Sequence, residues 1–132
     1  MLTITIDREL GDAVYAQVAQ QMRQLVASGA LAPGTPIPSV RQLARDLGVS
    51  LNTIARAYRL LESEGFLVIR DRAGVVVAAP AEVIEDSTRS ALLYELRAVL
   101  SRLRQAGIAN EELWLVLRQE VGVLEGGPRG DR

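Results

Sequence analysis

The side chains best suited to chemistry in this chain are Asn52, Arg56, Arg59 and Ser63. Their spacing of four and three residues puts them on one face of a helix, because successive residues turn by about 100°. Asparagine can pair with two atoms of adenine, and arginine with two atoms of guanine or with a phosphate. The pattern indicates a helix that contacts DNA. An ordinary solvated helix face is the alternative.

The same segment carries the signals that begin and bury a helix. Ser50 is suited to the N-cap, and Gly65 to the position just past the C-terminus. The predicted buried stripe consists of Ile54, Ala57, Tyr58 and Leu61. We expect Ser50 and Thr53, at the helix start, to support phosphate contact together with the backbone N–H groups there. Leu51 either touches a thymine methyl group or packs beside the stripe.

A shorter helix is predicted just before this one. Ser39 can N-cap it in a capping box with Gln42, and Gly48 allows the sharp turn that ends it. Arg41 and Arg45 lie one turn apart, and we expect both to contact phosphates. A structural salt bridge between Arg45 and an acid is the alternative. Two capped helices joined at a glycine are typical of a helix-turn-helix.

A β-hairpin, or wing, is predicted after the second helix, with strands at 66–70 and 75–79. We expect Arg72 and Gly74 to lie at its tip and Arg70 near the DNA backbone. Arginine is attracted to narrow minor grooves, and glycine permits close approach. The hairpin is therefore expected to cover the minor groove beside the helix. Its place in the sequence favours DNA binding over a plain solvated face.

The segment LAPGTPIPSVRQLARDLGVSLNTIARAYRLLESEGFLVIRDRAGVVVA resembles the N-terminal winged helix-turn-helix of GntR-family bacterial transcriptional regulators. The resemblance covers about residues 13–78 and implies that Arg41, the arginine of the family's P-S-x-R motif, can also reach a base. Leu51 and Ala55 depart from positions that are often basic in the family. The usual G-x-G-T of the wing is replaced at 73–76. These departures leave the fold intact and change the expected base preference.

Composition excludes several classes of function. The 132 residues contain no cysteine and no histidine, so neither a disulfide framework nor the commonest metal ligand is available. We expect no enzyme, no cofactor and no metal. The net charge of −1 is segregated, with a surplus of arginine in 38–74 and of acids in 80–126. No apolar run is long enough for a membrane span, so a cytoplasmic protein is predicted.

The N-terminal part is predicted to begin with a strand, in which Leu2, Ile4 and Ile6 share one face. Asp12 is predicted to cap a helix that extends to Ser28. The core stripe of that helix is Val14, Val18, Met22, Leu25 and Val26, with Tyr15 at its edge. Residues 31–38, with three prolines, are predicted to form an extended connector.

Two further helices are predicted beyond Pro80. The first begins at 83 or 87 and ends at Gln105, and Asn110 is predicted to cap the second. The first carries one apolar stripe, whereas the apolar residues of the second surround nearly the whole helix, more than one neighbour can cover, which indicates a dimer. The alternative is that this surface packs on the winged domain of the same chain. The predicted dimerisation residues are Leu92, Leu96, Leu103, Trp114, Leu115 and Val123. A two-helix tail of this length resembles the YtrA-type branch of the GntR family.

The predicted fold is mostly α with a small β-wing: a winged helix-turn-helix at 1–79, a two-helix dimerisation segment at 80–126 and a disordered tail at 127–132. The predicted function is that of a sequence-specific transcriptional regulator, a repressor, which binds an inverted-repeat operator in double-stranded DNA as a homodimer. The sequence specifies no effector. The alternative from another class is a winged-helix module that binds protein and not DNA.

Overall fold

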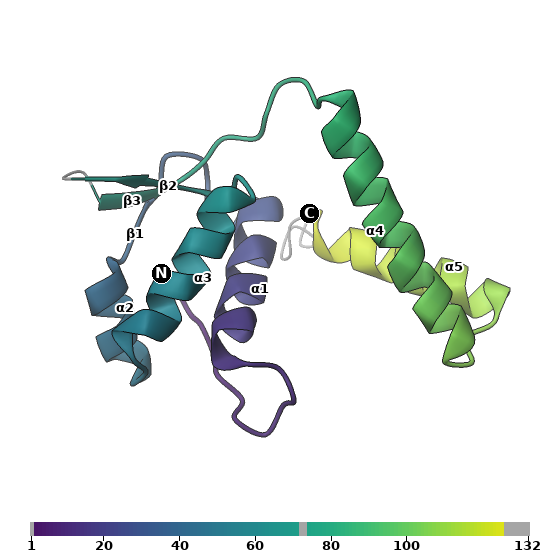
Figure 1. The fold of residues 1–132 in the computed structure, drawn as a ribbon, viewed down its shortest axis with the longest axis horizontal. Helices are drawn as coiled ribbons and strands as arrows, with labels where there is room; N and C mark the ends of the chain where they lie inside the picture. The colour runs from purple at the N-terminus through teal and green to yellow at the C-terminus, as the bar shows by residue number, and fades with distance from the viewer. Residues whose placement is uncertain (1, 72–73, 126–132) are drawn as a thin grey trace, which may run out of the picture. The chain divides into compact units, whose positions relative to one another are not determined.

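The computed structural model describes residues 2–71 and 74–125, which form two compact units. The first, the winged unit, contains the residues up to Pro80, and the second, the tail unit, contains Ala81–Leu124 (Figure 1). In chain order the elements are α1 (Val14–Ala27), β1 (Pro36–Ile37), α2 (Val40–Leu47), α3 (Leu51–Ser63), β2 (Leu67–Arg70), β3 (Gly74–Val77), α4 (Asp86–Gln105) and α5 (Asn110–Val123). The predicted fold class, helical with a small β-wing, is confirmed.

The core of the winged unit lies between α3, α1 and one face of the sheet. The whole predicted stripe of α3 is fully buried, with 0% exposure for each of Ile54, Ala57, Tyr58 and Leu61. Val18 and Met22 of α1 and Leu67 and Val77 of the sheet complete its centre. Burial of the seven large side chains among them supplies the main driving force for folding of this unit.

The boundaries of α2 and α3 follow from their capping residues. The Ser39 hydroxyl accepts a hydrogen bond from the Gln42 N–H at 3.0 Å, and the Ser50 hydroxyl accepts one from the Thr53 N–H at 3.1 Å. Gly48 adopts a left-handed conformation, φ 69°, that allows the chain to reverse between the helices. The return bond of the capping box, in which the Ser39 N–H donates to the Gln42 side chain, is absent among the described residues.

The sheet contains one strand that the sequence did not predict. Its order is β1-β3-β2, with all neighbours antiparallel. β1 comes from the connector, where Pro36 and Ile37 pair with Val76 and Val75 of β3. Proline is tolerated there because an edge strand leaves one side of its backbone unpaired. The connector is therefore extended, as predicted, but the prediction did not include its pairing with β3.

The prediction of an N-terminal strand was wrong, although the alternate residues Leu2, Ile4 and Ile6 do face the core as predicted. Residues 2–6 are extended without joining the sheet, and Ile4 is buried in the core with Leu2 and Ile6 against it. The backbone at Thr5, and at Asp7 just after this segment, forms hydrogen bonds with glutamine side chains of α1. The Gln21 amide accepts from Thr5 N–H at 2.9 Å and donates to Thr5 O at 2.6 Å. A side-chain amide thus supplies the pair of bonds that a neighbouring strand would supply.

The start of α1 also differs from its prediction. Ala13 occupies the N-cap position, and its methyl side chain makes no capping bond. The Asp12 carbonyl instead accepts a hydrogen bond from the amide of buried Gln17, whose second partner is Asp7 O. The Asp12 capping prediction was wrong because this side-chain contact, and not a local cap, fixes the backbone before α1.

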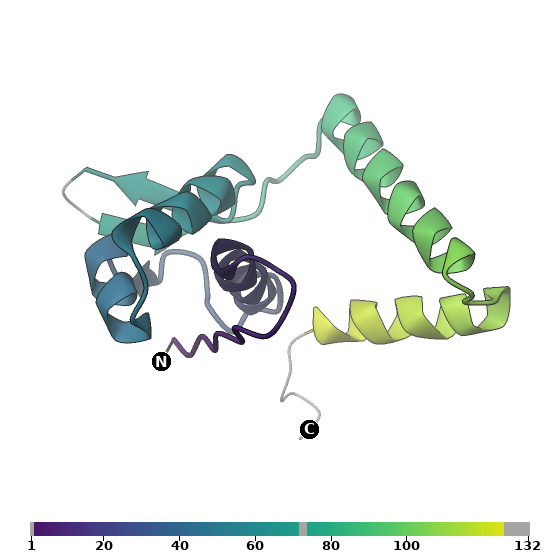
Figure 2. The ribbon, with the colours of Figure 1, turned by 60° about the horizontal axis from the view of Figure 1, so that its bottom comes forward.

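The tail unit is a helical hairpin with little internal packing. Gly107, φ 111°, forms the turn, and Ala109 is the N-cap of α5, so the prediction that Asn110 caps this helix was wrong. Residues 106–109 connect the two helices, and Asn110 is already the first helical residue of α5. α4 and α5 diverge from this turn (Figure 2). Leu113, close to the turn, is the one buried residue among those described in this unit.

Candidate nucleic-acid interface

The outer face of α3 is uncovered along its length. Asn52, Arg56, Arg59 and Ser63 are all exposed, opposite the buried stripe. Asn52 stands in the first turn of the helix, just after the Ser50 cap, and is exposed. The structure therefore brings an amide and two guanidinium groups onto one solvent-facing surface, as the spacing predicted.

The first turn of α3 presents polar groups as well. Ser50 is exposed, and its hydroxyl lies 2.9 Å from the Thr53 hydroxyl in addition to its capping bond. The first backbone N–H groups of a helix have few partners within the helix and favour an anion nearby. Leu51 is 44% exposed and is not among the residues packed against the core. Of its two predicted placements, the structure favours the exposed one.

The two arginines of α2 stand beside this surface. α2 lies next to the N-terminal half of α3 in both views (Figures 1 and 2). Arg41 and Arg45 are exposed. Within 2–71 and 74–125 one ion pair is present, between Arg23 and Glu64, so the alternative in which Arg45 is held by an acid is not found. Both guanidinium groups are available to an anion.

Arg56 has a partner that sequence reasoning missed. Its guanidinium carbon lies 3.8 Å from the centroid of the Tyr15 ring, and its Nη2 donates to the Tyr15 hydroxyl at 3.2 Å. Tyr15 was recognised at the edge of the α1 stripe, but its partner lies 41 residues away. The one signal in the sequence was an aromatic residue at the edge of a core stripe. Such a residue does not reveal which arginine will contact it.

The wing residues are described in part. Arg70 is exposed at the end of β2, and Gly74 begins β3 with φ 83°, a conformation that favours glycine. Gly74 pairs with Arg70 across the hairpin. Arg72, predicted at the tip, lies outside the described residues, as does the tail predicted to be disordered.

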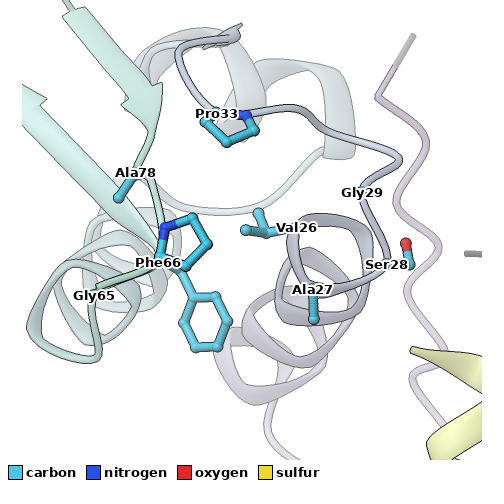
Figure 3. A pocket seen from close by; sticks show the side chains of 9 residues that line it. Val26, Ala27, Ser28, Gly29, Pro33, Gly65, Phe66 and Ala78 are labelled. Carbon is cyan, nitrogen blue, oxygen red and sulfur yellow. The ribbon is translucent and has the colours of Figure 1, made fainter. Parts of the chain in front are cut away.

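A hollow of about 510 Å³ marks another part of the winged unit (Figure 3). Its walls come from the end of α1, the connector, the link between α3 and β2 and the segment after β3, and Figure 3 shows Phe66, Val26 and Pro33 around it. No charged residue is among those that line it. It lies at the C-terminal ends of α1 and α3, whereas Asn52 and Arg56 lie in the first half of α3. We therefore exclude it from the nucleic-acid interface.

The predicted dimerisation residues lie on uncovered surfaces of the tail unit. Trp114 is 69% exposed and Leu115 57% exposed. Leu92, Leu96 and Val123 are also exposed, and Leu103, near the turn, is half-buried. Because α4 and α5 diverge, apolar residues away from the turn have no cover within this unit.

Two further features are absent from the described part of the chain. No group of three or more acidic residues there is arranged to hold a metal ion. No helix in that part of the chain is both long and apolar enough to cross a membrane.

Comparison with known proteins agrees with this geometry. The family model for bacterial regulatory proteins of the gntR family matches residues 14–77. The HTH-type transcriptional repressor YtrA of Bacillus subtilis (strain 168) is 28% identical over 129 residues, which are 97% of this chain and 99% of that protein. The structure of YtrA from Sulfolobus acidocaldarius, a GntR-family transcription factor, is 37% identical and covers 74% of this chain and 97% of its own, with a TM-score of 0.60.

A further solved structure resembles the winged unit. AraR(DBD) in complex with operator ORX1 is 30% identical, covers 58% of this chain and 96% of its own, and has a TM-score of 0.51. The resemblance to GntR-family regulators expected from the sequence is confirmed, and the likeness to YtrA extends over nearly the whole chain. The chain belongs to the GntR family of bacterial regulatory proteins.

Proposed function

We propose that the protein is a homodimeric transcriptional repressor that binds an inverted-repeat operator. One observation carries the DNA-binding part: α3 has a fully buried inner face and an exposed outer face that bears Asn52, Arg56 and Arg59. A helix held rigidly on one side, with base-pairing side chains on the other, fits the major groove. Two relatives support this proposal: the AraR(DBD) structure is a complex with operator ORX1, and YtrA of Bacillus subtilis is a transcriptional repressor.

Each predicted contact residue has a role in this proposal. Asn52 and Arg56 contact base edges, because recognition helices use their N-terminal residues for this purpose. Ser50 and Thr53 support the phosphate contact at the helix start, and Leu51 is exposed enough to touch a thymine methyl group. Arg41 and Arg45 of α2, Arg59 farther along α3 and the wing residues Arg70, Arg72 and Gly74 contact the backbone and minor groove.

The tail unit is proposed to join two copies of the chain. Its residues Leu92, Leu96, Trp114, Leu115 and Val123 are exposed on two helices that do not cover one another. A hairpin with so little buried surface needs a further partner to be stable. A second copy supplies one in which the same surface meets itself, as two-fold symmetry requires.

Dimerisation would also give the protein enough base contacts to select a specific site. One recognition helix touches a few base pairs, which is too few to select one site among genomic competitors. Two copies related by a two-fold axis double the contacts and match an inverted repeat. A protein with this function acts on the chromosome, so we place it in the cytoplasm.

Selection of bound duplexes from a random pool tests the DNA-binding proposal and reports the operator. We expect the recovered sites to contain two related half-sites in inverted orientation. Affinity for random duplex should fall steeply with salt, because contacts with phosphates release counterions. No enrichment, together with an affinity that does not change with salt, would favour the protein-binding winged-helix module instead.

Sedimentation of full-length variants tests the dimer. Leu96→Glu places a charge in the apolar stripe of α4, and Leu115→Glu places one on the uncovered side of α5. Both are expected to sediment as monomers and to bind the selected operator weakly. Ser87→Glu is the matched control, because it adds the same charge on the opposite face of α4. A wild-type protein that is monomeric at micromolar concentration would support the competing account, in which the tail packs on its own winged unit.

A further inference from the structure

We propose that Tyr15 is a positioning residue that holds the Arg56 guanidinium in place for DNA before the DNA arrives. This inference rests on the proposed DNA-binding function and adds a residue of α1 to it. Arg56 stacks on the Tyr15 ring at 3.8 Å and donates to its hydroxyl at 3.2 Å. One contact is with the face of the Tyr15 ring and the other with its hydroxyl, so two points on one side chain restrict the position of the guanidinium.

Two contacts show that α1 and α3 run side by side in the same direction. Tyr15, in the first turn of α1, meets Arg56 in the first half of α3. Arg23, nearer the end of α1, pairs with Glu64 just past the end of α3, with Nε–Oε1 at 2.7 Å and Nη2–Oε2 at 3.1 Å. Both pairs are separated by 41 residues. This register brings the start of α1 to the half of α3 that carries Asn52.

Tyr15 is a firm platform because its helix is anchored in the core. Val18 and Met22, one and two turns farther along α1, are fully buried. Tyr15 itself is half-buried and packs against the same core. Its ring therefore offers one face to Arg56 while the rest of the side chain is fixed by its packing.

Arg56 keeps most of its binding capacity in this arrangement. A guanidinium has five N–H donors in a planar fork, and the described contacts engage one nitrogen. The remaining donors are free for the two acceptors of a guanine edge or of a phosphate. A long side chain that is already ordered loses less conformational freedom on binding, which raises affinity without a new contact with DNA.

Arg59 gives an internal comparison on the same helix face. It is exposed, and among residues 2–71 and 74–125 it has neither an aromatic nor an acidic partner. Arg56 is thus singled out from a neighbour of the same type by the residue beneath it. Loss of the Tyr15 ring should affect Arg56 and leave the contribution of Arg59 unchanged.

A double-mutant cycle on the full-length protein tests the proposal. The probe is the highest-affinity duplex recovered from the random pool, with random duplex as reference. We expect Arg56→Gln to weaken operator binding about 10- to 100-fold, and Tyr15→Leu about three- to tenfold, the range of a stacking contact at an exposed site and the order it maintains. In the Arg56→Gln background Tyr15→Leu should change affinity less than about twofold, because its effect acts through Arg56. Tyr94→Leu is the control for loss of a tyrosine, since Tyr94 is exposed in the tail unit.

Two further measurements separate positioning from a purely structural role. Tyr15→Phe keeps the stacking ring and the packing, so it should restore operator affinity to within about twofold of the wild type. In the DNA-free protein the Arg56 side-chain N–H resonance should be shifted upfield by the ring, and this shift should persist in Tyr15→Phe and disappear in Tyr15→Leu. If Tyr15→Leu folds poorly, the upfield shift in the wild type and in Tyr15→Phe still tests the contact, and its absence from both would overturn the proposal.

The outcomes distinguish this proposal from the one it rests on. A wild-type protein that binds no duplex overturns the DNA-binding function and this proposal together. Wild-type binding with independent, multiplicative losses in the double variant overturns the positioning role alone. An unchanged or higher operator affinity of Tyr15→Leu also overturns the positioning role alone. Unchanged affinity would mean that Tyr15 has no part in binding, and higher affinity would mean that it keeps Arg56 from DNA.

Discussion

Replacement of Tyr58 by phenylalanine tests how the helix-turn-helix is held together. Tyr58 of α3 is fully buried, and its hydroxyl donates to the Pro38 carbonyl at 2.7 Å. Pro38 immediately precedes Ser39, the cap of α2. This hydrogen bond therefore ties the recognition helix to the chain that leads into its neighbour. Tyr58→Phe keeps the ring and its packing and removes the bond.

The magnitude follows from the burial of both partners. Without the hydroxyl, a partly buried carbonyl loses its donor, which costs about 1–2 kcal/mol of the free energy of unfolding. For a unit of this size each kcal/mol lowers the melting temperature by about 4–8 °C. We expect operator affinity to fall as well, because the α2 start is no longer fixed relative to α3.

The pH dependence of stability gives a second signature of the same group. Burial raises the pKa of the Tyr58 hydroxyl well above its usual value near 10. A pKa that is raised in the folded state contributes stability that is complete below the unfolded value and is lost as pH rises toward the folded value. Above pH about 10 the wild type should therefore lose up to about 1.4 kcal/mol per pH unit through this residue. Tyr58→Phe lacks this loss.

Urea unfolding followed by circular dichroism measures both effects, at neutral pH and at pH about 9.5–11. The stability difference between wild type and Tyr58→Phe should be largest at neutral pH and should shrink as pH rises. Tyr94→Phe is the matched control, because Tyr94 is exposed and its hydroxyl is in water. Equal stability of Tyr58→Phe and wild type at neutral pH, or parallel curves at high pH, would refute the reasoning.

Three further predictions concern the interface. Asn52→Ala should cost about 1–3 kcal/mol in binding to the selected operator and relax preference at one base position, measured by competition among single-base variants of the site; unchanged binding would remove Asn52 from the base contacts. Arg45→Ala should weaken binding to all duplexes alike and reduce the salt slope by about one, measured by anisotropy titration, whereas a loss confined to one sequence would contradict a phosphate role. Ser50→Ala removes the cap of α3 and should lower the free energy of unfolding by about 1 kcal/mol, measured by urea unfolding, with Ser63→Ala, near the other end of the helix, as the control.

The parts of the fold that were predictable are those set by short-range chemistry. Ser39 and Ser50 cap their helices because the required N–H lies three residues ahead in the same chain. The α3 stripe follows from the period of the helix, and the exposed face opposite it follows from the same period. For this reason the candidate interface on α3 could be predicted almost completely from the sequence.

Both capping errors arose where another local feature fixed the backbone in place of the expected cap. Asp12 was expected to cap α1, but the Gln17 amide binds its carbonyl, and the helix begins at Val14. Asn110 was expected to cap α5, but the turn at Gly107 is so tight that the helix has already begun there. In both cases the capping residue type was present and the backbone was fixed by another contact.

By itself the sequence determined the order of the helices, the turn at Gly48, the buried face of α3 and the polar face that contacts DNA in the proposed function. These depend on periodicity and on capping over three or four residues. Tertiary structure alone decided the pairing of β1 with β3, the glutamine bonds to residues 2–7 and the contact of Tyr15 with Arg56. Each of these joins segments at least ten residues apart. Such contacts depend on how helices pack against one another, because one side chain can meet any of several distant partners until the core fixes the register.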